Sequence, residues 1–316
     1  MNAGVQGLLW CLTFVALEAV QAVYFGSVFQ RMDSFLIGSL VFGISASAAI
    51  GLTLLRRPEE ITLALADPGA LALVNLYSAG AWIAYLLAVQ LIEPAVVFAI
   101  FSGSVPLTTL AAARLGMPQA SSARNRLEAL GISIIALGLA VLIFITLAGW
   151  SGFVRGGPSV AAAGVTLSTA SGSLISLLLL YARRLDRRGV GPVAQFGLRF
   201  PLYVLLSVGG IALGLDAKGP VTGEDVVLVV IVGLFLMAFP IFAMQKAVAL
   251  VSVLTIAAMT SLGPVLVFGF QMIEGRVDHA PATLTGLLVY FVGALLATAG
   301  SSKAAGRGGK ALTEVR

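Results

Sequence analysis

Two ionisable side chains lie deep inside long apolar stretches of this sequence, Glu18 in the first stretch and Arg199 in the seventh. A charge at the centre of a bilayer costs at least ~2.5–3.5 kcal/mol, so such side chains face a partner or a water-filled cavity. Counted from the same end of the bundle, they lie at depths of about 16 Å and about 9 Å. We therefore predict that they share one polar cavity. Glu18 would take up and release a proton there, while Arg199 would stay charged and hold Glu18 or an anionic ligand group.

Two other interpretations of this pair are open. Glu18 and Arg199 can form a buried ion pair that only fixes two helices, or Arg199 can extend its long side chain to the membrane surface. Polar and aromatic residues at helical spacing favour a cavity, because a lipid-facing surface does not need such rows. Serine and threonine rows also join helices to each other, and aromatic belts mark membrane interfaces. The predicted binding residues are Glu18, Gln21, Asn75, Trp82, Tyr85 and Arg199.

The composition requires a membrane environment for these residues. Apolar residues make up 59% of the 316 residues and charged residues only 10%, whereas a soluble domain carries about 25% charged residues. The chain has one cysteine, Cys11, and one histidine, His279. These counts exclude an intrachain disulfide and a thiolate cluster, and they remove most zinc chemistry. We expect no metal and no cofactor.

Ten stretches are long and apolar enough to cross a membrane as helices, since about 20 such residues are needed. Barrel strands would be about half as long and would alternate between polar and apolar residues. The sequence therefore predicts an all-α integral membrane protein with ten transmembrane helices. The windows are 7–29, 34–55, 70–92, 94–114, 127–149, 159–181, 193–215, 225–245, 250–272 and 281–301.

The lysines and arginines predict the orientation of these helices. With the N-terminus in the cytoplasm, fourteen of the 19 basic residues lie on the cytoplasmic side and four lie outside. Because basic residues favour cytoplasmic loops, both chain ends are predicted to be cytoplasmic in a multi-pass protein of the cytoplasmic (inner) membrane. The net charge of +5 then follows from topology, and no nucleic-acid partner is expected.

An internal repeat divides the ten helices into two sets of five. Pro106 and Pro264 lie in the middle of the fourth and ninth windows, and the same offset pairs Ser102 with Thr260. Because five is odd, the second set is inverted in the membrane, a plan that recurs in secondary transporters with a site near the midplane. The predicted units are 1–150 for the first repeat, 151–302 for the second, and 303–316 for a cytoplasmic tail.

Glycine rows mark the fifth and tenth windows of the two repeats. The rows have a spacing of seven residues, which places a smooth stripe on one face of each helix. Such stripes permit close contact between helices, and we expect packing to be their role. The glycines are Gly131 and Gly138 in the fifth window and Gly286, Gly293 and Gly300 in the tenth.

The stretch from Ala243 to Arg276 resembles the penultimate-helix signature of EamA-type transporters of the drug/metabolite transporter (DMT) superfamily. Its elements here are Pro264-Val265 in mid-helix and Glu274-Gly275 at the exit. The first-half copy keeps Pro106 but has Gly116 where the second has Glu274. The resemblance implies two EamA-like repeats and transport of amino acids, aromatic compounds, nucleotide sugars or other metabolites, in many members as export.

Four prolines fall within predicted membrane helices: Pro106, Pro201, Pro240 and Pro264. Each removes one internal hydrogen bond and bends its helix. They are hinge candidates for a protein that alternates between two conformations. Static kinks that shape a cavity are an equally open interpretation.

These observations together predict a secondary-active exporter of a small polar or amphipathic metabolite, such as an amino acid, working by alternating access. The cavity would be lined by windows one, three, four, six, seven, eight and nine. The alternative is a flippase for a lipid or lipid-linked sugar. We expect no enzyme, because the only histidine lies in a predicted loop, and a channel filter is missing from the sequence. The expected partners are a small-molecule substrate and the lipid bilayer, and the chain would be a monomer or homodimer.

Overall fold

The computed structural model describes residues 3–117, 119–120, 122–123, 125–260, 262–275 and 277–313. Within these residues every regular element is a helix, and one isolated β-bridge joins Ile92 to Val154. The α-helices are α1 Ala3–Val28, α2 Ser34–Arg56, α3 Glu59–Leu65, α4 Pro68–Leu91, α5 Pro94–Arg114, α6 Arg126–Leu147, α7 Pro158–Arg187, α8 Pro192–Leu198, α9 Pro201–Ala212, α10 Gly223–Gly233, α11 Phe239–Leu250, α12 Val253–Thr260, α13 Gly263–Glu274 and α14 Pro281–Thr313; a π-helix, η1 Leu234–Ala238, joins α10 to α11.

Nine helical segments of the described chain are long and apolar enough to cross a membrane. Two of them combine consecutive helices, one from Pro192 to Ala212 and one from Gly223 to Leu250. The all-α membrane architecture predicted from hydropathy is therefore present. Nine of the ten predicted windows coincide with these segments, and most of the predicted ends fall within a few residues of the observed ones.

The window 250–272 differs from its prediction as one continuous helix. The chain forms two helices there, α12 ending at Thr260 and α13 beginning at Gly263. Pro264 occupies the first turn of α13, where its missing N–H leaves no internal hydrogen bond unmade. At the other end, the Ser252 hydroxyl accepts a hydrogen bond from the Thr255 amide at 3.0 Å and caps the start of α12.

The other three hinge candidates also differ in their effect on the backbone. Pro201 and Pro240 lie in the first turns of α9 and α11, each after an interruption of the α-helix. Pro106 lies inside α5, which continues as one α-helix through it. The prolines thus start new helices at three positions, while their role as hinges stays a prediction.

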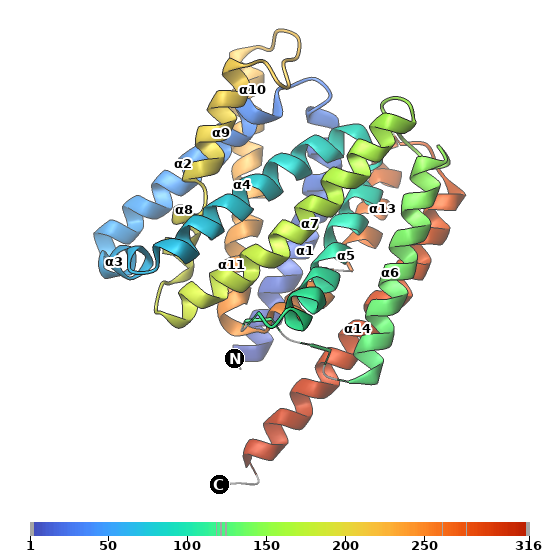
Figure 1. Ribbon diagram of the computed structural model, residues 1–316. Helices are drawn as coiled ribbons and strands as arrows, with labels where there is room; N and C mark the ends of the chain where they lie inside the picture. Colours follow the sequence, from blue (N-terminus) through green and yellow to red (C-terminus); the bar gives the residue numbers. More distant parts are fainter. Residues whose placement is uncertain are drawn as a thin grey trace.

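The helices form one bundle in which neighbours along the chain are often not neighbours in space (Figure 1). Helix α7 packs against α4 and α5, and α1 packs against α11, α12 and α13. Helix α2 packs against α8 and α9, while α6 lies along α14. Figure 1 also shows that α1 begins and α14 ends at the same end of the bundle.

The contact between α6 and α14 confirms the predicted packing role of the glycine rows. A Cβ atom added to Gly131 would lie 2.2 Å from the Ala297 amide nitrogen, and one added to Gly293 would lie 2.5 Å from that of Ile135. Only glycine allows backbones to approach so closely. Helix α14 then continues to Thr313, so the predicted tail 303–316 begins as a helix. Residues 314–316 lie outside the described residues.

Candidate functional site

Glu18 and Arg199 line one cavity in the middle of the bundle. Glu18 comes from the centre of α1, and Arg199 follows the last residue of α8, where the segment is interrupted before α9. Their exposed fractions are 1% and 3%. The two side chains therefore share one cavity, although its other walls are apolar and aromatic rather than polar, and Arg199 does not extend to the membrane surface. The other lining residues are Phe14, Trp82, Phe101, Ile175, Leu178, Leu179, Ile241 and Met244.

This cavity is small and closed. Its volume is about 10 Å³, which is the space needed for about one water molecule. A second cavity of about 10 Å³ touches Glu18 from the side of Tyr85 and Ser171. The first cavity has lining residues from every window predicted to line the site except the window 250–272, and the second has lining residues from α1, α4, α5 and α7 only. Neither can hold a metabolite in this conformation.

The two charged side chains do not form an ion pair. Among the described residues, no cation lies within 4.0 Å of the Glu18 carboxylate, and its Oε1 atom has no hydrogen-bond partner. The Arg199 Nε donates to the Ser78 hydroxyl at 3.2 Å. Its guanidinium also lies 5.1 Å from the centre of the Phe200 ring, a distance at which cations and aromatic faces attract. Ser78 is a partner that the sequence-based binding set does not include.

Asn75 lies near Arg199, but its side chain is hydrogen-bonded to backbone groups. Its Nδ2 donates to the Leu198 carbonyl at 2.7 Å, and its Oδ1 accepts from the Leu202 amide at 3.3 Å. These are backbone groups left free by the interruption between α8 and α9, and free groups inside a membrane protein need such replacements. The structure therefore brings Asn75 to the site as the residue that holds the interruption in shape.

Gln21, Trp82 and Tyr85 form the other side of the site. The Tyr85 hydroxyl donates to Gln21 Oε1 at 3.3 Å, and Trp82 packs edge-on against Tyr85 with ring centres 5.8 Å apart. The Nε2 of Gln21 and the Nε1 of Trp82 have no partner although both residues are buried. Buried donors without partners are rare in folded proteins, so a water or a ligand is needed to satisfy them.

Further buried polar atoms without partners lie outside the predicted set. They include Gln195 Oε1 and Gln245 Nε2. Gln195 is one turn from Arg199, which is a signal that helical spacing in the sequence provides. Gln245 lies on α11, whose helix also supplies Ile241 and Met244 to the cavity. The hydropathy pattern of the sequence does not predict that Gln245 belongs to the site.

A buried carboxylate ties the ends of the helices together at each end of the bundle. At the end where α1 begins, Asp67 accepts from Arg184 Nε at 2.7 Å and from the Ala70 amide at 3.3 Å. Burial alone would raise the pKa of Asp67, but the Ala70 amide and the Arg184 and Arg188 guanidinium groups hold it below its usual value.

At the opposite end, Glu93 precedes α5 and accepts from three different segments. Its donors are the Gly152 amide at 2.8 Å, the Gln271 amide group at 2.5 Å and the Thr283 hydroxyl at 2.9 Å. Burial raises the pKa of Glu93 in spite of these hydrogen bonds, which act to lower it. Asp67 thus joins the start of α4 to the end of α7, and Glu93 joins the start of α5 to α13 and α14 at the opposite end of the bundle.

Metal ligands do not gather at the site. Across the residues that the structure describes, no three His, Cys, Asp or Glu side chains come together in a way that could hold a metal ion. The site therefore offers one carboxylate, one guanidinium, unpartnered amide and indole donors, and aromatic walls.

The chain matches no protein-family model and no curated protein sequence. Its fold matches a crystal structure of another protein with a TM-score of 0.63. The match covers 95% of this chain and 98% of that chain, and the two sequences are 18% identical. At this identity the likeness establishes a shared fold and nothing about function.

Proposed function

We propose that this protein is a secondary-active transporter, working as an exporter, that moves a small polar or amphipathic metabolite such as an amino acid by alternating access. The observation that carries this proposal is the closed central site. Glu18 Oε1, Gln21 Nε2 and Trp82 Nε1 lie buried there without partners, beside a cavity of only about 10 Å³. A site with unmet hydrogen bonds and no room for a ligand must open before it can bind one.

The helix contacts support two inverted five-helix repeats, 1–150 and 151–302. Exchanging the two halves replaces the contact between α4 and α7 by the contact between α1 and α11. It replaces the contact between α5 and α7 by the contacts of α1 with α12 and α13. The contact of α6 with α14, and the contact of α2 with α8 and α9, are each the same contact before and after the exchange. This is the contact pattern expected for two repeats related by a two-fold axis in the membrane plane.

We count α12 and α13 together as one further span, which brings the number of spans to ten. Nine crossings would leave α1 and α14 with their free ends on opposite sides of the membrane, yet these ends lie at one end of the bundle (Figure 1). The two helices run from Val253 to Glu274, about the length that a membrane span needs. The EamA-type resemblance and its Pro264-Val265 motif fit this architecture, which makes membership of the DMT superfamily part of the proposal.

The positive-inside rule supports cytoplasmic chain ends and a place in the cytoplasmic (inner) membrane. Helices α2 and α7 end at the end of the bundle at which α1 begins (Figure 1), and their last residues are Arg56 and Arg187. In this orientation Asp67 closes the cytoplasmic side and Glu93 closes the outer side. Transport would then require these two closures to open in turn.

In the proposed mechanism Glu18 exchanges a proton as the site alternates, and Arg199 holds an anionic group of the substrate. Ser78 fixes one edge of the guanidinium through its hydrogen bond, and Gln21 with Trp82 supplies donors to the substrate. Trp82 and Tyr85 provide apolar walls. Proton uptake by Glu18 removes the charge that would neutralise Arg199 and so favours binding of the anionic group. Proton loss restores the Glu18 carboxylate as a competitor for Arg199 and so favours release of the substrate.

The proposal can be tested with purified protein in proteoliposomes and a panel of amino acids, aromatic compounds, nucleotides and sugars. Ligands are first identified by the rise in melting temperature that binding produces, and their counterflow is then measured. We expect Glu18→Gln and Arg199→Lys to reduce counterflow to the level of empty vesicles with unchanged melting temperature of the free protein. Glu59→Gln, an exposed carboxylate at the end of the bundle, is the matched control. Full activity of both site variants would refute the site assignment.

A further inference from the structure

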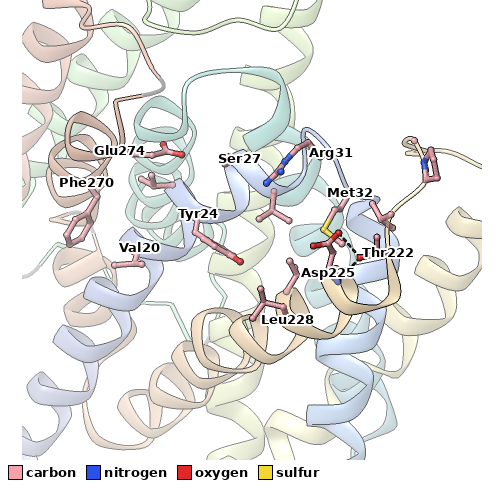
Figure 2. Close-up of a pocket in the computed structure, with 16 residues that line it drawn as sticks. Val20, Tyr24, Ser27, Arg31, Met32, Thr222, Asp225, Leu228, Phe270 and Glu274 are labelled. Atoms are coloured by element: carbon pink, nitrogen blue, oxygen red, sulfur yellow. Dashed lines mark hydrogen bonds between the residues drawn. The ribbon is translucent and has the colours of Figure 1, made fainter.

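A cavity of about 600 Å³ opens in the side of the bundle, away from the central site (Figure 2). It lies between α1, α10 and α13, at the end of the bundle opposite the start of α1. Its walls along the spans are apolar, and its outer end carries charged and hydroxyl groups. The apolar residues include Val20, Val23, Leu228, Val229 and Phe270, and the polar ones include Tyr24, Arg31, Thr222, Asp225 and Glu274.

The lateral cavity is separate from the central site. On α1 it uses Val20, Tyr24 and Ser27, whereas Glu18 and Gln21 point into the bundle. At helical spacing these two sets lie on different faces of α1. Occupation of the lateral cavity therefore does not require the central site to be open, and its ligand need not be the transported substrate.

The dimensions of the lateral cavity match one leaflet of a bilayer. It follows α1 from Val20 to Val28, a rise of about 12 Å at 1.5 Å per residue, and continues past the end of the helix to Arg31. Half of the hydrocarbon core of a bilayer measures about 15 Å. Leu228 and Phe270 on the two sides have exposed fractions of 59% and 37%, so the cavity is open toward the lipid along this length. A lipid chain fits this length, and a small soluble metabolite would leave most of the apolar wall uncovered.

The charges at the outer end select the headgroup. Arg31 carries an exposed guanidinium, a group that binds phosphate through paired N–H donors. Asp225 is a carboxylate whose Oδ2 accepts from the Thr222 hydroxyl at 2.7 Å, which fixes its orientation at the start of α10. Figure 2 shows Arg31 on the α1 side and Asp225 on the α10 side of the same opening. Glu274 adds a second carboxylate to the lining of the cavity. One cation and two carboxylates at one opening complement a headgroup that carries both a phosphate and an ammonium group.

We propose that this lateral cavity binds a membrane phospholipid with a zwitterionic phosphate–ammonium headgroup, with one acyl chain along α1 and the headgroup between Arg31 and Asp225. The lipid fills the gap between α10 and α13 and stabilises the position of both helices against α1. Because it binds on another face of α1, the proposal stands apart from the proposed transport function.

The first test measures lipid binding to delipidated protein in detergent, by native mass spectrometry and by melting temperature. Phosphatidylethanolamine is expected to bind with one retained molecule per chain and to raise the melting temperature. Leu228→Trp fills the cavity and abolishes both effects. Leu205→Trp is the matched control, because Leu205 is also apolar and 67% exposed but lies on α9 outside the cavity. Equal lipid binding by both variants would overturn the proposal.

The second test examines the headgroup. Arg31→Gln is expected to weaken phosphatidylethanolamine binding about tenfold, which corresponds to about 1.4 kcal/mol. Phosphatidylglycerol, which lacks the ammonium group, should bind about tenfold more weakly than phosphatidylethanolamine for a similar reason. Equal binding of the two lipids would overturn the headgroup assignment. A full melting-temperature rise with soluble phosphoethanolamine alone would overturn the role of the acyl chain.

A third measurement separates this proposal from the transport proposal. Glu18→Gln should bind phosphatidylethanolamine as the unmodified protein does, because Glu18 is not among the residues of the lateral cavity. Loss of lipid binding in Glu18→Gln would show that the lipid occupies the central site. That outcome would overturn the lateral cavity assignment and would favour a lipid as the transported substrate.

Discussion

The side chain of Asn75 on α4 donates a hydrogen bond of 2.7 Å to the carbonyl of Leu198, the last residue of α8. The same side chain accepts from the first turn of α9. One residue thereby spans the interruption that places Arg199 in the central cavity. The shape of the candidate site depends on this contact between the two halves of the chain.

Replacing Asn75 tests this role. Asn75→Leu keeps a similar volume but leaves the Leu198 carbonyl and the Leu202 amide without partners, which costs about 1–3 kcal/mol for each buried group. We expect a clear loss of stability in detergent unfolding, together with a changed position of Arg199. Ser133→Ala is the control, because Ser133 is exposed and bonds only within its own helix. An unchanged unfolding midpoint for Asn75→Leu would show that the interruption is held by other contacts.

The glycine contact between α6 and α14 gives a second prediction. Gly293→Ala places a methyl group 2.5 Å from the Ile135 amide nitrogen, and a backbone cannot move aside as a flexible side chain can. We expect a large loss of thermal stability. Gly51→Ala, also within a helix, meets no atom within 4 Å and should be neutral or slightly stabilising, because alanine favours helix more than glycine. Similar behaviour of the two variants would contradict close packing of α6 on α14.

The Asp67 contact predicts an acid-sensitive closure. The pKa of Asp67 is lowered in the folded protein, so its contribution to stability is present above the unfolded value of about 3.9. That contribution is lost as the pH falls through the lower folded value. Asp67→Asn retains a good cap for α4 but removes the ion pairs with Arg184 and Arg188. Because both arginines are more than a third exposed, the expected loss at neutral pH is only about 0–1 kcal/mol.

The measurement for Asp67 is the unfolding midpoint as a function of pH, from neutral to acidic conditions. The unmodified protein should lose stability more steeply than Asp67→Asn at the acidic end. Parallel pH profiles for the two proteins would show that Asp67 is not responsible for any acid loss. A loss far above 1 kcal/mol at neutral pH would show that the carboxylate does more than pair with two partly exposed arginines.

Much of the fold could be predicted from the sequence because hydropathy acts locally. Runs of about 20 apolar residues predicted the spans. The glycine rows predicted close packing for the helices that carry them, although not that α6 and α14 pack against each other. The two isolated charges, Glu18 and Arg199, could be placed in one cavity because a bilayer leaves few other solutions.

The remaining features depend on contacts between residues far apart in the sequence. Arg199 binds Ser78 across 121 positions, and Asn75 reaches Leu198 across 123. A single serine or asparagine in an apolar run does not indicate which backbone group it will meet. The division of the window 250–272 into two helices also could not be predicted, because the hydropathy of this window is uninterrupted. Only Pro264 indicates that a new helix begins there.

The unpartnered donors of the central site lead to the last prediction, which separates a binding role from a structural one. Trp82 Nε1 has no partner although Trp82 is buried, so the free protein bears the cost of desolvating that N–H group, about 1–3 kcal/mol. Trp82→Phe removes the group and keeps an aromatic ring against Phe42, whose ring centre is 5.0 Å away. The smaller ring also leaves a void, which costs stability. The two effects oppose each other, and we expect little net change in the melting temperature without ligand.

With a metabolite ligand present the prediction is different. If Trp82 donates to the substrate, the ligand-induced rise in melting temperature should shrink in Trp82→Phe, because the bound state loses a hydrogen bond that the free state never had. Phe144→Leu on the exposed side of α6 is the control for loss of aromatic area, and it should keep the full ligand effect. A large loss of stability in the free Trp82→Phe protein, with the ligand effect intact, would assign Trp82 to packing and move the substrate elsewhere in the bundle.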